Sequence, residues 1–203
     1  MVTEMDNLWL DLLNSDYHDH RGRGRSEDRL ENQKWLASFL ARWDLPHREV
    51  QAEDTRKALQ GLRSLLLRIM TSLRAGERPR AKDIDVLNGH LSAAPLFRCV
   101  ERDEGGFKVS LRAVESGLPA ALAEIAGSFA EVLADGDPNR IKLCDNPDCR
   151  WVFYDQSKSR TRRWCDGGSC GNLLKVRRFR ERKTRRAAEQ PHSNDADSAG
   201  GEA

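Results

Sequence analysis

Long apolar runs are missing from this chain of 203 residues. Charged residues make up 33% of it, hydrophobic residues only 38%, and the mean hydropathy is −0.70. No stretch approaches the roughly 18–20 apolar residues that a membrane-spanning helix needs, so we exclude a transmembrane protein and expect no membrane partner. The opening MVTEMDNLWL also lacks the basic and then apolar segments of a secretory signal. We therefore expect a cytoplasmic protein.

The common catalytic motifs are absent as well. The sequence contains no glycine-rich phosphate loop, no G-x-S-x-G elbow and no H-E-x-x-H motif. The cluster His18-Asp19-His20 lies in a polar stretch, and three side chains so close in the chain cannot easily ligate one metal. We expect a protein that is not an enzyme and has no catalytic residues.

Charge is unevenly distributed, although the whole chain carries a formal net charge of only +2. Residues 1–140 have a net charge of −3, whereas residues 141–203 have a net charge of +5. Between Lys158 and Arg186, 12 lysines and arginines accompany two acids, which gives this stretch a net charge of +10. The asymmetry indicates an acidic or neutral body joined to an end that binds a polyanion, with a solvated basic tail as the alternative.

Hydrophobic spacing predicts a compact, mainly helical unit over residues 1–135. We expect helices at about residues 5–13, 28–45, 52–74, 79–94 and 119–133, and a polar loop at 14–26. Leu96–Val100 and Phe107–Leu111 flank Gly105-Gly106 and predict a β-hairpin. We assign residues 136–140 to a linker, 141–187 to a second unit, and 188–203 to a disordered tail without large apolar side chains.

Four of the five cysteines fall within 27 residues and form two C-x4-C pairs, namely Cys144, Cys149, Cys165 and Cys170. Zinc takes four thiolates at tetrahedral corners, and two short turns with two sulfurs each can supply them. Two disulfides, which a reducing cytosol disfavours, and an iron–sulfur cluster are the alternatives. We predict one structural Zn²⁺ per chain, because four protein ligands leave no open position for catalysis. Loss of one ligand should then melt this unit while residues 1–135 stay folded.

Aromatic and basic residues surround these cysteines. We expect Trp151, Phe153 and Trp164 to pack around the metal, with stacking on nucleic-acid bases as the alternative. Residues 171–186 have the composition of a helix, in which Ser169 caps the start and Leu173, Val176 and Phe179 face the zinc unit. The expected fold class is therefore α+β: a predominantly α-helical N-terminal domain with one β-hairpin, plus a small C-terminal four-cysteine zinc-finger module ending in a basic helix.

The C-terminal residues resemble the CGNR zinc finger, a bacterial module named for four residues that begin at its last cysteine. The counterparts here are Arg162-Arg163-Trp164-Cys165, Cys170-Gly171-Asn172-Leu173 and Lys175-Val176-Arg177-Arg178. Phe153-Tyr154-Asp155 and Ser157 are similar to the family's F-x-D-x-S stretch. Leu173 replaces the arginine of the family's name, which removes one candidate basic contact.

Proteins of that family usually carry an N-terminal ABATE domain, a ligand- or stress-sensing unit of transcription regulators. Leu10-Asp11-Leu12-Leu13-Asn14-Ser15 is similar to the L-D-F-x-N-T opening of that domain, with the aromatic residue and the threonine replaced. The resemblance implies that residues 1–135 form an ABATE-like sensing domain and residues 141–187 a CGNR-type zinc finger.

Together these features predict a zinc-dependent, DNA-binding transcriptional regulator whose N-terminal domain senses a small molecule or mediates assembly into homo-oligomers. The residues expected to contact nucleic acid are Arg162, Arg163, Lys175, Arg177, Arg178 and Arg182. Six phosphate contacts would give the logarithm of duplex-DNA affinity a slope of roughly −5 against the logarithm of salt concentration. The alternatives are an RNA- or ribosome-associated zinc module and a protein-interaction adaptor that binds an acidic partner.

Overall fold

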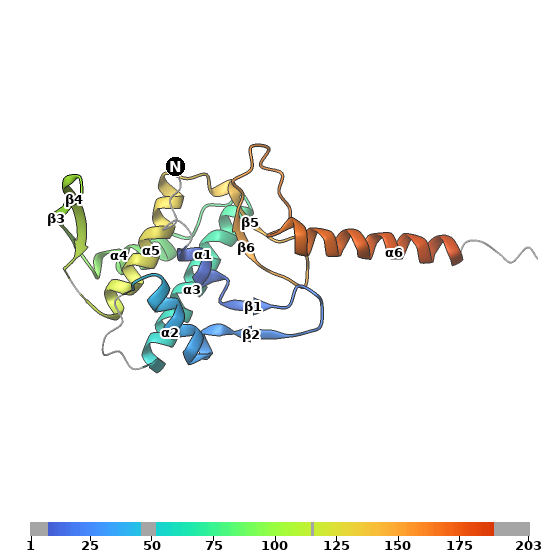
Figure 1. The fold of residues 1–203 in the computed structure, drawn as a ribbon, viewed down its shortest axis with the longest axis horizontal. Helices are drawn as coiled ribbons and strands as arrows, with labels where there is room; N and C mark the ends of the chain where they lie inside the picture. The colour runs from blue at the N-terminus through green and yellow to red at the C-terminus, as the bar shows by residue number, and fades with distance from the viewer. Residues whose placement is uncertain (1–7, 46–51, 115, 189–203) are drawn as a thin grey trace, which may run out of the picture.

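Helices make up most of the N-terminal part of the molecule. The computed structural model describes residues 8–45, 52–114 and 116–188 (Figure 1). The helices of the N-terminal part are α1 (Leu8–Leu13), α2 (Gln33–Arg42), α3 (Ala52–Arg74), α4 (Ala81–Ser92) and α5 (Leu118–Ala134). Two antiparallel hairpins accompany them, β1 (Asp16–His18) with β2 (Ser26–Asp28) and β3 (Leu96–Asp103) with β4 (Gly106–Ala113).

The C-terminal part is built from short elements and one long helix. In chain order these are the 3-10 turn η3 (Pro138–Arg140), the paired strands β5 (Ile141–Leu143) and β6 (Val152–Tyr154), the π-helical turn η4 (Gly167–Gly171) and the helix α6 (Asn172–Ala188). The α+β fold class predicted from the sequence is confirmed.

Helices α1, α3 and α5 enclose the hydrophobic core. Leu59, Leu62 and Ile69 recur at helical spacing on α3, and each side chain is at most 1% exposed. Trp9 of α1 packs against Phe129 of α5, with their ring centroids 5.3 Å apart. Burial of each such side chain contributes about 1.5–3 kcal/mol, so this packing fixes α3 against its two neighbours. Among the described ranges, no helix has the length and apolar character of a membrane span.

The element positions predicted from the sequence agree in most places. Helix α3 has the predicted bounds, and α4, α5 and the β3–β4 hairpin differ from prediction by a few residues. Helix α2 begins later than predicted because residues 29–31 form a 3-10 turn (η2) and the side chain of Asn32 then accepts the N–H groups of Lys34 and Trp35. The predicted start near Met5 and residues 189–203 of the predicted tail lie outside the described residues.

Residues 14–26 form ordered structure where the sequence predicts a loop. Strands β1 and β2 pair with Asp16 opposite Asp28 and His18 opposite Ser26. Three-residue strands made of polar side chains lack the apolar alternation that marks a half-buried strand, so the sequence pattern does not reveal them. Residues 19–25 connect the two strands, and we call them the β1–β2 loop.

Strands β3 and β4 form an amphipathic hairpin at the end of the molecule opposite α6 (Figure 1). Residues paired across the hairpin share a face, so Val100 and Val109 lie on one face while Glu101 and Lys108 lie on the other. The apolar face carries five side chains that are each 58–77% exposed, namely Leu96, Val100, Phe107, Val109 and Leu111. Nothing in the described part of the chain covers it.

The C-terminal part shares one core with the N-terminal helices. Ile141 of β5 and Val152 of β6 are buried in the same cluster as Trp9 and Phe129. The buried Asn14 strengthens this junction: its Nδ2 donates to the carbonyl of Val152 at 3.0 Å, and its Oδ1 accepts the N–H of Val152 at 2.8 Å. The amide therefore gives β6 the two hydrogen bonds that a neighbouring strand would give it.

Candidate metal centre and basic helix

The four predicted cysteine ligands lie together in the C-terminal part. Their sulfur atoms are all within 4.8 Å of one another. The Sγ atom of Cys165 lies 3.7 Å from that of Cys149 and 3.8 Å from that of Cys170. A zinc ion bound by four thiolates at about 2.3 Å places the sulfurs about 3.8 Å apart, so this cluster has the dimensions of a tetrahedral zinc site.

A tight turn between β5 and β6 presents the first cysteine pair. The N–H of Cys144 donates to the carbonyl of Trp151 at 2.8 Å, and the N–H of Cys149 donates to the carbonyl of Asn146 at 2.9 Å. Arg150 has a φ of 53°, a left-handed conformation that returns the chain towards β6. The turn therefore places the sulfurs of Cys144 and Cys149 next to those of the second pair, Cys165 and Cys170.

A capped helical turn presents the second pair. The carboxylate of Asp166 accepts the N–H groups of Gly168 and Ser169 at the start of η4, which contains Cys170. The prediction that Ser169 caps this helix is wrong, because Asp166 occupies the N-cap position and helical structure begins at Gly167. The metal ligands Cys165 and Cys170 therefore fix the point at which α6 starts.

Burial and mutual hydrogen bonding set the protonation of the thiols. The hydrogen bond from Cys165 lowers the pKa of the Cys149 thiol to about 5 and raises the pKa of Cys165. Burial raises the pKa of Cys170 to about 11. Four sulfurs at these distances cannot all ionise unless a cation compensates their charge. A closed set of four soft ligands fits Zn²⁺ in a structural role, in which all four thiolates hold the ion and stabilise the fold.

The loop between the cysteine pairs is organised around the fully buried Asp155. Its carboxylate accepts hydrogen bonds from Lys142 Nζ at 2.6 Å, from the N–H of Arg162 at 3.0 Å and from Ser157 Oγ at 2.6 Å. Burial alone would raise the pKa of this carboxyl, but the bonds from Lys142 and Ser157 outweigh burial and hold the pKa well below its usual range. Asp155 is therefore a charged structural anchor at neutral pH.

Two of the predicted nucleic-acid contacts, Arg162 and Arg163, make structural contacts within the chain. Arg162 donates from Nε to the carbonyl of Trp164 at 2.9 Å and from Nη2 to the carbonyl of Cys165. Arg163 forms a 2.6 Å ion pair with Asp145. Both guanidinium groups therefore support the metal-binding turns.

Arg177 also has partners inside the molecule. Its Nη1 lies 2.7 Å from Asp148 Oδ2, and its Nη2 donates to the carbonyl of Arg21 at 2.8 Å. It thereby connects α6 both to the first metal-binding turn and to the β1–β2 loop. The other three predicted contacts are exposed and have no hydrogen bond or ion pair with a described residue: Lys175, Arg178 and Arg182.

Helix α6 extends away from the body after its first turn (Figure 1). Val176 is 38% exposed and Phe179 is 60% exposed, so the prediction that both face the zinc unit is wrong. Their three-residue spacing is compatible with a packed helical stripe, but the helix leaves the body before the stripe meets a surface on which to pack.

The aromatic residues of the module pack as expected. Trp151 and Trp164 are half-buried against the cysteine cluster, and Phe153 is buried. Tyr154 packs against the main core, and its hydroxyl accepts the N–H of Asp137 at 3.0 Å. These rings therefore shield the metal site and the junction with the body.

Asn146 and Asp148 are site residues that sequence reasoning missed. Asn146 is fully buried, donates from Nδ2 to the carbonyl of His20 at 2.8 Å, and lies 3.5 Å from the sulfur of Cys170. Asp148 is the partner of Arg177. Their position between two ligand cysteines is the one sequence signal that points to them, since side chains next to metal ligands commonly orient those ligands.

Comparisons with known proteins agree with this architecture. The family model described as "CGNR zinc finger" matches residues 140–183. The ABATE model, described as "Putative stress-induced transcription regulator", matches residues 6–136. No curated protein matches the chain. The chain therefore belongs to the ABATE family, and it ends in a CGNR zinc finger whose four cysteines hold one structural zinc ion.

Proposed function

We propose that this protein is a cytoplasmic, zinc-dependent regulator of transcription that binds DNA through α6, without a catalytic role. One feature carries this proposal, a stripe of unpaired cations on a helix that stands clear of the body. The stripe consists of Lys175, Arg178, Arg182 and Arg186, which are exposed and have no hydrogen bond or ion pair with a described residue. Because they are three or four positions apart, they share one face of the helix.

The dimensions of this stripe suit duplex DNA. From Lys175 to Arg186 it is about 16 Å long at the rise of an α-helix. The major groove is about 12 Å wide and admits one helix, and α6 has free space around it beyond its first turn. Zinc is part of the proposal because Cys170 lies in η4, the turn that directly precedes α6, so the metal holds the base of the helix in place.

The six residues predicted to contact DNA divide into two groups under this proposal. Arg162, Arg163 and Arg177 position the module through their contacts within the chain. Lys175, Arg178 and Arg182 contact the DNA phosphates, and Arg186 extends their stripe. Four contacts give an expected slope of about −4 in the salt dependence of binding, instead of the roughly −5 of the sequence-based estimate.

The two alternatives to DNA binding, an RNA-binding module and a protein-interaction adaptor, require different surfaces. An RNA-binding module would need aromatic rings free to stack on bases, whereas Trp151, Tyr154 and Trp164 are packed and Phe179 is the exposed ring of α6. A protein-interaction adaptor would use the same basic helix on an acidic partner. The binding experiment described below distinguishes both alternatives from DNA binding.

Sensing of a ligand by the N-terminal part, or its assembly, belongs to the same proposal and rests on the family description. In this proposal, the chain assembles into a homodimer by binding a second copy of itself through the apolar face of the β3–β4 hairpin. That face presents on the order of 500 Å² of apolar surface, the size at which exposed patches mark interaction sites. Two such faces packed together would bury about 1,000 Å², the lower bound for a specific interface.

Fluorescence anisotropy of the zinc-loaded chain with duplex DNA and with single-stranded RNA, over a series of salt concentrations, tests the function. Arg178→Ala with Arg182→Ala should weaken duplex binding about tenfold and make the salt slope shallower by about 2. Lys108→Ala with Arg112→Ala removes the same charge from the face of the distant hairpin opposite its apolar face, and should change neither quantity.

Arg177→Ala is unsuited to this test because it also breaks the contact between α6 and the β1–β2 loop. Tighter binding to RNA than to duplex DNA would favour the RNA-binding alternative. An affinity for both nucleic acids that does not change with salt concentration would contradict nucleic-acid binding. An acidic protein would then remain as the partner that binds α6.

A further inference from the structure

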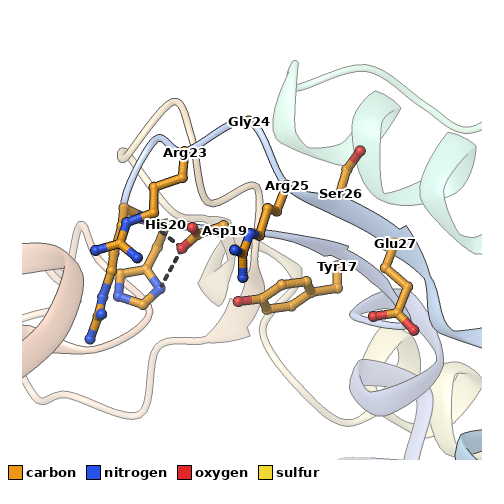
Figure 2. A pocket seen from close by; sticks show the side chains of 9 residues that line it. Tyr17, Asp19, His20, Arg23, Gly24, Arg25, Ser26 and Glu27 are labelled. Atoms are coloured by element: carbon orange, nitrogen blue, oxygen red, sulfur yellow. Dashed lines mark hydrogen bonds and ion pairs between the residues drawn. The ribbon is translucent and has the colours of Figure 1, made fainter.

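The β1–β2 loop surrounds an open hollow of about 710 Å³ beside the C-terminal part (Figure 2). Residues on its walls include Tyr17, His20, Arg21, Arg23 and Arg25. In the view of Figure 2, the side chains of His20 and Arg23 lie on one side of Asp19, and that of Arg25 lies on the other side, next to Tyr17. The function proposed above makes no use of this cluster.

The cations of the hollow are largely uncompensated. The guanidinium groups of Arg21, Arg23 and Arg25 are exposed and have no hydrogen bond or ion pair with another described residue. Of the two acids on the walls, Asp19 accepts the backbone N–H of Arg21 at 3.0 Å and lies 4.0 Å from Nδ1 of His20. Glu27 is an exposed acid that accepts a 3.5 Å hydrogen bond from Asn32. The three arginines therefore outnumber the two acids on the walls, and their guanidinium N–H groups have no partner among the described residues.

The loop has a defined shape before any ligand arrives. The N–H of Asp19 donates to the carbonyl of Arg25 at 2.9 Å, and the N–H of Gly22 donates to the carbonyl of Asp19 at 3.0 Å. Gly22 and Gly24 have φ values of 72° and 70°, left-handed conformations that glycine adopts without a steric penalty. A ligand would thus meet arginines on a backbone that is already ordered, which reduces the entropy that binding costs.

The loop is also fixed in position next to α6. Arg177 of α6 donates to the carbonyl of Arg21, and Asn146 of the metal-binding turn donates to the carbonyl of His20. The contact is close, since a Cβ atom on Gly22 would lie 2.6 Å from Oδ2 of Asp148. The hollow therefore lies close to the basic stripe, because Arg177 is bonded to the loop and the next residue, Arg178, belongs to the stripe.

We propose that this hollow is a phosphate-binding site, and that it receives a backbone phosphate of the DNA whose groove α6 occupies. Arginine's planar fork of N–H donors matches the oxygens of a phosphate group, and the surplus of positive charge favours an anion. The site adds a contact from the N-terminal domain to a duplex otherwise contacted by the zinc finger alone. The identification of DNA as the source of the phosphate rests on the proposed function. The proposal that the hollow binds a phosphate group does not depend on that function.

The test uses the zinc-loaded full chain and the double variant Arg23→Ala with Arg25→Ala. Neither side chain has a partner within the described residues, so the variant should retain its zinc content and its thermal midpoint. We expect it to weaken duplex binding about tenfold near 0.1 M salt and, because the hollow receives one phosphate, to make the salt slope shallower by about 1. The matched control is Lys108→Ala with Arg112→Ala on the polar face of the β3–β4 hairpin, which has the same net charge and should bind as the unaltered chain does.

A second measurement separates DNA from a free phosphate as the source. Inorganic phosphate and pyrophosphate are titrated into the ¹⁵N-labelled chain while the side-chain Nε–Hε signals of Arg23 and Arg25 are followed. Weak shifts with phosphate alone and strong shifts with duplex DNA support the DNA backbone as the ligand. Saturable shifts with pyrophosphate in a chain that does not bind DNA would support the site with a small phosphorylated ligand, although the proposed function would then have failed.

Two results would overturn the phosphate site. If the α6 variant loses DNA binding while Arg23→Ala with Arg25→Ala matches the hairpin control, the loop is not a phosphate contact and the proposed function still stands. If neither DNA nor pyrophosphate shifts the two arginine signals, the hollow binds no phosphate of any source.

Discussion

A single polar side chain, that of Asn14, connects the two parts of this molecule. Asn14 satisfies both backbone groups of Val152 in a buried setting, while its neighbour Ser15 accepts a hydrogen bond at 2.7 Å from Arg63 of α3 in the N-terminal part. Both residues belong to the opening motif that resembles the start of an ABATE domain. The motif is therefore a structural junction between the helical part and the zinc finger.

Asn14→Ala should destabilise the chain by about 3 kcal/mol, because it leaves the buried N–H and carbonyl of Val152 without partners. Urea denaturation of the zinc-loaded protein measures this loss. Asn139→Ala is the matched control, since that exposed side chain bonds only Asp137 among the described residues, and it should cost less than about 0.5 kcal/mol. Equal midpoints for the two variants would show that Asn14 does not support the junction.

The hairpin and the basic helix are the two elements that leave the body. A two-stranded hairpin is marginally stable in water when nothing packs on it, yet β3 and β4 pair over eight residues each with their apolar face uncovered. Helix α6 keeps Phe179 exposed in the same way. Both elements have the surfaces expected of parts that meet another molecule.

Assembly through the hairpin predicts opposite results for two adjacent residues of β4. Val109→Lys places a charge in the middle of the apolar face, whereas Ser110→Lys places the same charge on the other face. Light scattering during size-exclusion chromatography should show a dimer for the unaltered chain and for Ser110→Lys, and a monomer for Val109→Lys. A monomer in all three samples would exclude a dimer built on this face.

At the scale of the whole molecule, one hydrophobic cluster spans both family regions. Ile141 and Val152 belong to the zinc-finger region and are buried among side chains of α1, α3 and α5. Zinc binding should therefore stabilise the N-terminal helices as well as the module that contains the ligands. The sequence-based expectation is that residues 1–135 stay folded when the module melts, and the shared cluster adds that they should lose stability.

Cys165→Ala should release the zinc and lower the midpoint of the helical core by roughly 10 °C, because the core loses about 3 kcal/mol of burial from Ile141 and Val152. Near-ultraviolet circular dichroism during heating, together with zinc analysis, measures both effects. Cys99→Ala alters a cysteine of β3 outside the metal cluster and should change neither the zinc content nor the midpoint. A core midpoint that is identical in Cys165→Ala and the unaltered chain would refute the coupling.

Much of the fold and of the metal site could be predicted from local signals. The stripe on α3 has helical spacing from Leu59 to Ile69, and α3 has the predicted bounds. The four cysteines could be assigned because paired spacing directly reflects the turns that hold a metal. In contrast, the β1–β2 hairpin and the later start of α2 depend on polar pairing and on the cap at Asn32, which hydrophobic periodicity does not report.

The sequence by itself determined the chemistry of this protein: four thiolates that hold zinc, a helix rich in arginine, and the absence of a membrane-length apolar run. Tertiary structure decided which charges are free, since Arg177 bonds Asp148 and the β1–β2 loop while Arg178 beside it has no partner among the described residues. It also decided that Val152 lies in the main core. The physical reason is that composition and spacing fix which groups are present, whereas pairing between residues more than 100 positions apart depends on how the chain folds back.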